Sequence, residues 1–214
     1  RMRGETIDEI TGFAKVMREK MAVVNPDSPV LDIVGTGGDL SNSFNISTTA
    51  SFVIAGAGQK VAKHGNRSVS SKSGAADVLE ALGVKITSTP RKAEACLNEV
   101  GLSFLFAQSY HSAMRFVGPV RGQIGVRTVF NILGPLANPA KADYMVLGVY
   151  DPDLLETMAK VLMNLGIKRA LLIYGNDNLD EFSISAPTTV CEVKDGKIIK
   201  YEISPTDFGL RMGS

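Results

Sequence analysis

Three glycines and a carboxylate follow an apolar segment near the start of the chain, in the sequence LDIVGTGGDLSNSFNISTTA from Leu31 to Ala50. Glycine lets backbone N–H groups converge on an anion, because no Cβ stands in the way. The spacing is not a dinucleotide fingerprint, since Leu40 stands where the third glycine would be, and no Gly-Lys-Ser/Thr follows to make a P-loop. Asn45, Ser47 and Thr48 then open an apolar helix, whose free N–H groups point back at the glycines. We predict an anion site here; simple helix capping by these side chains is the alternative.

A second polar stretch has the sequence KVAKHGNRSVSSKSGAADVLEALG. Between Lys63 and Lys72 it offers cations, amides and hydroxyls, with Val69 as the apolar exception. A solvated loop could have this composition, but its position at a strand end favours a second phosphate-binding loop that faces the first. Two anion sites on one sheet indicate a ligand with phosphates at both ends.

Two adjacent carboxylates, Asp180 and Glu181, follow a strand and a turn in LLIYGNDNLDEFSISAPT. In a loop both can reach a shared hydrated cation, and Mg²⁺ prefers a few carboxylates together with waters and phosphate oxygens. A solvent-facing acidic pair is the alternative, and the two phosphate loops make the metal site competitive with it.

The elements that must position these residues alternate along the chain. Short apolar runs predict strands near 30–34, 60–63, 84–87, 103–106, 144–150 and 169–174. Between them, helices are predicted near 47–57, 74–82, 90–100, 112–117, 119–133 and 152–165, with one further helix capped near Thr6. This order is typical of an α/β fold with a mainly parallel sheet, in which ligands sit at the carboxyl ends of the strands. After Thr188, Asp195-Gly196 predicts a β-hairpin.

The composition sets broad limits on function. The 214 residues are 44% hydrophobic, enough to fill a core, and 23 Lys and Arg balance 22 Asp and Glu to a formal charge of +1. No overall field therefore favours nucleic acid or an anionic membrane. Cys96 and Cys191 show no metal-ligand spacing, which suits a reducing cytoplasm, and we expect a cytoplasmic protein.

Five sequence blocks together carry a resemblance to a known family. They are GTGGD at 35–39, NIST at 45–48, KHGNRSVSSKSGAADVLEALG at 63–83, NILGPLANP at 131–139 and LDE at 179–181. In type and order they resemble anthranilate phosphoribosyltransferase over nearly the whole chain.

The resemblance implies transfer of the 5-phosphoribosyl group from phosphoribosyl diphosphate (PRPP) to the amine of anthranilate, in tryptophan biosynthesis. It implies a nucleoside-phosphorylase-like α/β domain at residues 26–214, with Mg²⁺ as cofactor. Residues 1–25 are expected to be the remainder of a small helical domain, through which the full-length protein forms a homodimer. PRPP and anthranilate are the expected partners, and no nucleic acid or membrane is expected.

The resemblance also implies residue roles, none of them a catalytic acid, base or nucleophile. PRPP binding would fall on Gly35, Gly38, Asp39, Ser43, Asn45, Ser47, Thr48, Lys63, His64, Gly65, Asn66, Arg67, Ser68, Val69, Ser70 and Ser71. Anthranilate binding would fall on Gly35, His64, Asn66, His111, Arg121, Gly134 and Pro135. The Mg²⁺ ligands would be Ser47, Asp180 and Glu181.

Some of these roles stay open. Arg121 is the expected fork for the anthranilate carboxylate, and Arg127, in the same segment, ranks below it. A carboxylate beside an anion site should repel the ligand, so Asp39 is expected to order the loop or to accept hydrogen bonds from a metal-bound water or a ribose hydroxyl. Ser112 and the sequence RFVGPVR depart from the family pattern and leave the shape of the acceptor tunnel open.

Two other functions are compatible with this architecture. A pyrimidine nucleoside phosphorylase would share it, but GTGGD and the acidic pair favour a diphosphate with a metal. A non-catalytic nucleic-acid-binding homologue would gain a basic surface and lose those carboxylates. Because the chain starts within a helical pattern and ends in turn-like residues, we expect a fragment with weak or no activity of its own.

Overall fold

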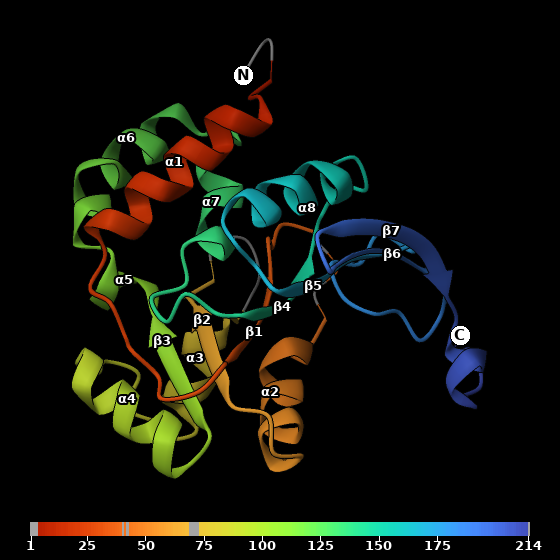
Figure 1. The fold of residues 1–214 in the computed structure, drawn as a ribbon, viewed down its shortest axis with the longest axis horizontal. Coiled ribbons are helices and arrows are strands. Elements are labelled where there is room, and N and C mark those ends of the chain that lie inside the picture. The colour runs from red at the N-terminus through yellow and green to blue at the C-terminus, as the bar shows by residue number, and fades with distance from the viewer. Residues whose placement is uncertain (1–3, 40, 42, 69–72, 214) are drawn as a thin grey trace.

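The computed structural model describes residues 4–39, 41, 43–68 and 73–213, except for the side chains of residues 121 and 122. Within this part, seven strands form one sheet in the order β3-β2-β1-β4-β5-β6-β7 (Figure 1). The strands are β1 (Leu31–Gly35), β2 (Val61–Gly65), β3 (Leu102–Phe106), β4 (Tyr144–Gly148), β5 (Arg169–Gly175), β6 (Thr188–Lys194) and β7 (Lys197–Ile203). The first five pair in parallel, and β6 and β7 add antiparallel strands at one edge. The predicted mainly parallel α/β fold with a C-terminal hairpin is confirmed.

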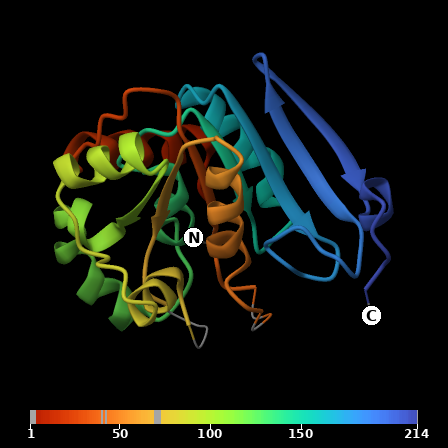
Figure 2. The same cartoon turned by 90° about the horizontal axis from the view of Figure 1, so that it is seen from below.

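The order in which strands are added to the sheet reverses between β1 and β4. From β1 the chain adds β2 and β3 on one side, and then crosses to β4 on the other. The loops that leave β1 and β4 therefore separate at their carboxyl ends, where open α/β sheets bind ligands. Figure 2 shows the β6–β7 hairpin at the edge of the sheet opposite β3.

Helices cover both faces of this sheet. The α-helices are α1 (Ile7–Lys20), α2 (Ile46–Gly56), α3 (Ala75–Ala81), α4 (Pro90–Glu99), α5 (Ala107–Tyr110), α6 (Gly118–Ile124), α7 (Phe130–Leu136) and α8 (Leu154–Asn164). Two 3₁₀ helices, η1 (Ser112–Phe116) and η2 (Pro205–Phe208), complete the set in the described residues. In Figure 1, α1, α7 and α8 lie together on one side of the sheet and α2 lies on the other.

The largest hydrophobic cluster lies beneath α1, α7 and α8. Ile10 and Ala14 of α1 pack there with buried residues of α7 and α8 and of strands β4, β5 and β6. The Thr6 hydroxyl accepts the Glu9 N–H while Glu9 accepts the Thr6 N–H, so a capping box begins α1 as the sequence predicts. Arg18 then donates to the carbonyl oxygens of Leu136 and Leu165, at 2.7 and 3.2 Å. These contacts tie α1 to the ends of two other helices.

The structure corrects two predicted elements. Residues 84–87 form no strand, because Gly83 turns the chain at φ +85° and Ile86 packs with Ala76, Leu79 and Phe106 as a buried loop. The helix predicted over 119–133 is two helices, α6 and α7. Gly125 at φ +63° separates them, and a left-handed residue ends a helix.

The hairpin turn follows its sequence signal closely. Asp195 and Gly196 have φ values of +51° and +70°, as a type I′ turn requires at both central positions. The register pairs Lys194 with Lys197 and runs unbroken to Thr188 and Ile203.

Candidate functional site

A cavity of about 1050 Å³ lies at the carboxyl ends of the parallel strands. Its walls come from segments that follow β1, β2, β3, β4 and β5, together with α7 and the segment before it. Of the predicted site residues, those lining it are Gly35, Gly38, Asp39, Ser43, Asn45, Ser47, Lys63, His64, Gly65, Asn66, Arg67, Ser68, His111, Gly134, Asp180 and Glu181. Residues far apart in the sequence thus meet in one place, as predicted.

The glycines at the ends of β1 and β4 make room for a carboxylate. A Cβ at Gly35 would collide with the Asp180 carboxylate, and one at Gly148 would collide with the Asp180 carbonyl oxygen. Gly37, at φ +66°, donates its N–H to Asp180 Oδ2 at 2.8 Å. The glycines therefore seat Asp180 as well as exposing backbone, a role that the sequence did not predict.

In the acidic pair Asp180 is buried and Glu181 is half-buried, and the pair carries excess negative charge. Asp180 is 8% exposed, and burial together with the charge of Asp39 raises the pKa of Asp180 to about 6. Burial and the neighbouring Asp180 raise the pKa of Glu181 to about 7, although Glu181 Oε1 accepts the Ser47 N–H at 3.1 Å. Carboxylates in this condition favour a cation beside them.

No group of three or more His, Cys, Asp or Glu arranged as metal ligands occurs in the described residues. A closed protein cage is therefore absent from that part of the chain. Two carboxylates and the Ser47 hydroxyl still fit Mg²⁺, because this ion keeps several waters and takes phosphate oxygens from its substrate. The buried Oδ2 of Asp39, without a hydrogen-bond partner among the described residues, adds a further acceptor at the same wall.

The alternation of strand β2 sends two neighbouring residues to opposite faces. The Lys63 ammonium donates to Ile33 O at 2.7 Å and to Ser47 Oγ at 3.1 Å, on the α2 side. His64 Nδ1 lies 3.2 Å from Gly134 O, on the α7 side. Burial lowers the pKa of Lys63, and Asp32 and Glu181 oppose this shift. Lys63 is thus held by protein oxygens next to the acidic pair.

Two imidazoles form the opposite wall. The rings of His64 and His111 lie 5.1 Å apart with a 55° tilt, and both side chains are buried. Burial first, and then the nearby His111, lowers the pKa of His64 to about 3; burial also lowers the pKa of His111. Both rings are therefore neutral near pH 7. With Nδ1 of His64 donating to Gly134 O, its Nε2, which has no partner in the described part of the chain, is an acceptor.

The second predicted loop is anchored by a residue that the sequence motifs did not single out. Asp77 Oδ2 accepts the N–H groups of Ser68 and Gly74 at 3.0 and 2.9 Å, and its Oδ1 accepts Arg67 at 3.0 Å. Arg67 also pairs with Glu80 at 2.9 Å. The acid in SGAADV, three residues after Gly74, is the capping signal that could have predicted this. Arg67 lines the cavity but is engaged by α3. Val69, Ser70 and Ser71 lie outside the described residues.

Other predicted positions lie away from the cavity or differ from their expected role. Thr48 and Pro135 are buried and are not among the residues lining the cavity. Arg121 lies in α6, and its side chain is outside the described part. Arg127, ranked below it, lines the cavity and donates from Nη2 to Gly38 O at 2.5 Å. Asn45 begins α2 without a side-chain cap, and its Nδ2 instead donates to Ser73 O at 3.4 Å, joining the two loops.

Comparison with known proteins identifies the family to which this chain belongs. Residues 27–214 match the model of the glycosyl transferase family, a/b domain, and the chain belongs to that family. Over 211 residues the chain is 59% identical to the anthranilate phosphoribosyltransferase of Endomicrobium trichonymphae, an alignment that covers 99% of this chain and 63% of the relative. The predicted resemblance is confirmed.

Solved structures agree with the sequence relatives. The fold is similar to anthranilate phosphoribosyltransferase from Thermus thermophilus, with a TM-score of 0.93 and 46% identity over all of this chain and 63% of that one. It is also similar to the Saccharomyces cerevisiae enzyme in complex with PRPP and Mg, with a TM-score of 0.90 and 34% identity over 98% of this chain and 58% of that one. Another structure of the yeast protein is in complex with 4-fluoroanthranilate. The chain spans about three fifths of the length of these relatives.

No helix in the described residues is long and apolar enough to cross a membrane.

Proposed function

We propose that this chain carries the active site for transfer of the 5-phosphoribosyl group from PRPP to the amine of anthranilate, with release of diphosphate. One observation carries the proposal: a single cavity collects the glycine loop, the Asp180–Glu181 pair and the two neutral imidazoles. The relatives bear the corresponding name, and the yeast relative binds PRPP with Mg and an anthranilate analogue.

The donor end of the cavity suits an anionic ligand. The first turn of α2 contains no acidic residue, and Ser43 and Asn45 line the cavity just before it. Free N–H groups and the helix dipole at this end favour phosphate oxygens. The link from Asn45 to Ser73 brings the second loop against the first, so that both can face one ligand with two phosphate groups.

Asp180, Glu181 and Ser47 are the residues proposed to hold Mg²⁺. When bound, the ion would neutralise charge on the departing diphosphate. The raised pKa values of both carboxyls support this assignment, because each reports buried negative charge that a cation would compensate. The Lys63 ammonium donates to the Ser47 hydroxyl oxygen at 3.1 Å.

The acceptor end suits a neutral aromatic amine. His64 offers the lone pair of a neutral Nε2, which can accept an amine N–H. His111 stands 5.1 Å away, and Asn66 lines the same cavity. Arg121 remains the proposed partner of the anthranilate carboxylate, on the resemblance of its segment.

These roles give a mechanism based on positioning and electrostatics. The glycine loop and the first turn of α2 hold the diphosphate while the bond to ribose C1 lengthens and the sugar becomes positively charged. The histidine wall holds the amine toward C1. Because an aromatic amine adds to so electrophilic a carbon without prior deprotonation, the site needs no strong base.

The test combines turnover with binding. We expect formation of phosphoribosyl anthranilate from PRPP, anthranilate and Mg²⁺, and none of the reaction of uridine with phosphate. Calorimetry with PRPP should also show Mg²⁺-dependent binding. Phosphorolysis of uridine, or salt-sensitive DNA binding without PRPP binding, would replace the proposal.

The remaining expectations are part of the same proposal. They are a cytoplasmic homodimer that contacts its partner through a helical domain including residues 1–25, and an α/β domain of residues 26–214. The size of the whole protein in solution by light scattering tests the dimer.

A further inference from the structure

Arg127 joins two parts of the cavity that are far apart in the sequence. It lies between α6 and α7, directly before the helix that carries Gly134. Its Nη2 donates to Gly38 O at 2.5 Å, in the glycine loop that follows β1. The bond therefore links the acceptor wall to the donor loop.

Tyr150 holds the guanidinium in place. Arg127 Cζ lies 4.1 Å from the centre of the Tyr150 ring, close enough for a cation–π contact. The Tyr150 N–H in turn donates to Thr36 Oγ1 at 3.0 Å, and the Thr36 N–H donates to Gly148 O at 2.9 Å. Arg127, Tyr150 and Thr36 thus connect the glycine loop with the ends of β1 and β4; we call these three residues the clasp.

The shape of the loop matches this contact. Gly38 has a φ of +81°, and a Cβ there would lie 2.8 Å from Arg127 Nη2. Because the peptide group is planar and trans, a Gly38 carbonyl held by Arg127 directs the Asp39 N–H the opposite way. The positive guanidinium also lies against the negative end of that carbonyl.

We propose that Arg127 is a positioning residue that fixes the glycine loop for the phosphoribosyl donor and couples it to the acceptor wall. This inference rests on the proposed function for the identity of the donor. The role differs from that of a fork for the acceptor's carboxylate, because the guanidinium donates to a backbone carbonyl of the glycine loop.

Two measurements test the clasp. Hydrogen exchange of a peptide covering residues 31–39, without substrate, reports the loop directly, and calorimetry with PRPP and Mg²⁺ reports the donor site. In Arg127→Ala we expect faster exchange of this peptide and about tenfold weaker PRPP binding, since a charge-assisted hydrogen bond is lost. Arg127→Lys should fall between, because it keeps the charge but loses the planar stack.

Matched variants separate the clasp from general effects. Tyr150→Leu removes the ring against which the guanidinium lies and should follow Arg127→Ala in both readouts. Arg91→Ala removes an exposed arginine of α4 outside the cavity lining and should change neither readout.

Each other result has a defined meaning. Unchanged exchange in Arg127→Ala overturns the positioning role, and weaker binding with unchanged exchange would show direct contact with the donor instead. Failure of the wild type to bind PRPP would overturn the proposed function, while the exchange measurement would still decide whether Arg127 holds the loop.

Discussion

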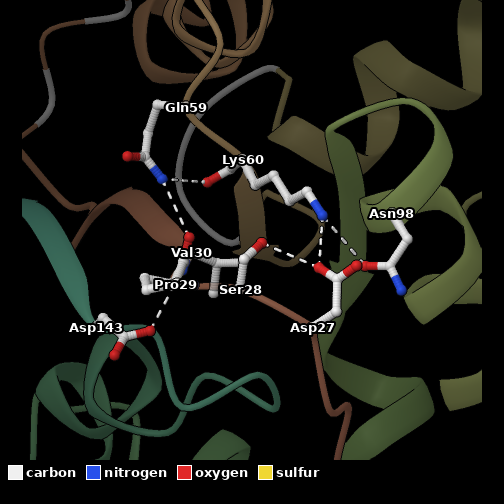
Figure 3. A network of polar contacts seen from close by, with 8 residues as sticks. All are labelled: Asp27, Ser28, Pro29, Val30, Gln59, Lys60, Asn98 and Asp143. Carbon is white, nitrogen blue, oxygen red and sulfur yellow. Dashed lines mark hydrogen bonds and ion pairs between the residues drawn. The ribbon is translucent and has the colours of Figure 1, made fainter.

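The environments of Lys60 and Lys63 differ in how they compensate charge. Lys60 lies at the amino ends of the parallel strands, and Lys63 lines the cavity at their carboxyl ends. Lys60 lies just before β2 and pairs with Asp27 at 2.6 Å, with side chains 23% and 56% exposed. Figure 3 shows this pair beside Ser28 and Asn98, which bond Asp27 and Lys60 respectively. Lys63 is 3% exposed and donates to a backbone carbonyl and a serine, with no carboxylate of the described residues in direct contact.

Polar groups at the amino ends of the strands are paired with one another, whereas the charges at the carboxyl ends are only partly compensated. Near Lys60, Gln59 donates to the carbonyls of Pro29 and Lys60, and Asp143 accepts the Val30 N–H at 3.3 Å (Figure 3). Exposed pairs of this kind contribute little to stability. At the carboxyl ends of the strands, charges are buried with incomplete compensation, which costs stability. Such an arrangement is typical of functional sites. The two ends of the strands therefore separate the contacts that hold the sheet from the cavity proposed to bind the ligand.

The largest expected effect follows from removing the buried negative charge. In Asp180→Asn/Glu181→Gln, both side chains keep an oxygen that can accept the N–H groups of Gly37 and Ser47. The fold should therefore persist while Mg²⁺-dependent PRPP binding weakens at least about a hundredfold, or about 2.7 kcal/mol. Calorimetry with and without Mg²⁺ measures this. Asp27→Asn, at the amino ends of the strands, is the control and should bind PRPP like the wild type. If the double variant also bound PRPP like the wild type, the metal assignment would be wrong.

The space left by Gly148 should matter almost as much. Gly148→Ala places a Cβ against the Asp180 carbonyl, and such overpacking costs about 1–3 kcal/mol of unfolding free energy. PRPP binding should fall with it, because Asp180 must move. Gly12→Ala provides the matched control: its Cβ meets nothing within 4 Å inside α1, so urea unfolding should show stabilisation by up to about 1 kcal/mol. If Gly148→Ala changed neither the unfolding free energy nor PRPP binding, the close contact between Gly148 and the Asp180 carbonyl would be contradicted.

The buried imidazole predicts a stability that declines in acid. Because the pKa of His64 is about 3 in the folded chain and about 6.5 when unfolded, only the unfolded chain gains a proton as pH falls below 6.5. The stabilisation is complete above that pH and is lost progressively toward pH 3. Between pH 7.5 and 4.5 the wild type should lose about 2–3 kcal/mol more than His64→Gln in urea unfolding.

His64→Gln also removes the neighbouring contributions from this comparison. Asp32, whose pKa burial raises to about 6, acts in the opposite direction, since its stabilisation is lost as pH rises through 6. Asp32 and His111 are present in both chains, so their contributions cancel to first order. Parallel pH profiles for the two chains would show that His64 is accessible to protons.

The sequence predicted which residues line the cavity better than it predicted the contacts that hold them. Periodicity and turn chemistry predicted the parallel sheet and the hairpin at Asp195-Gly196, because both depend on local patterns. The failed strand at 84–87 shows the limit: an apolar run of that length also fills a buried loop, and tertiary packing decides. Gly148, Asp77 and Tyr150 were missed because their roles depend on what another segment brings beside them.

The smallest effect returns to the two lysines. Lys60→Met should change the unfolding free energy by less than about 1 kcal/mol, because its exposed pair gains little over hydration. Lys63→Met keeps the volume but leaves Ile33 O and the charges of Asp32 and Glu181 without their cation. An unsatisfied buried group costs about 1–3 kcal/mol, so we expect a loss in that range, with weaker Mg²⁺-dependent PRPP binding because Ser47 is no longer held. Urea unfolding and calorimetry measure both variants. Equal effects of the two substitutions would contradict the difference between the two ends of the strands. A larger effect of Lys63→Met than of Lys60→Met on both unfolding free energy and PRPP binding would show this difference between two lysines only three residues apart.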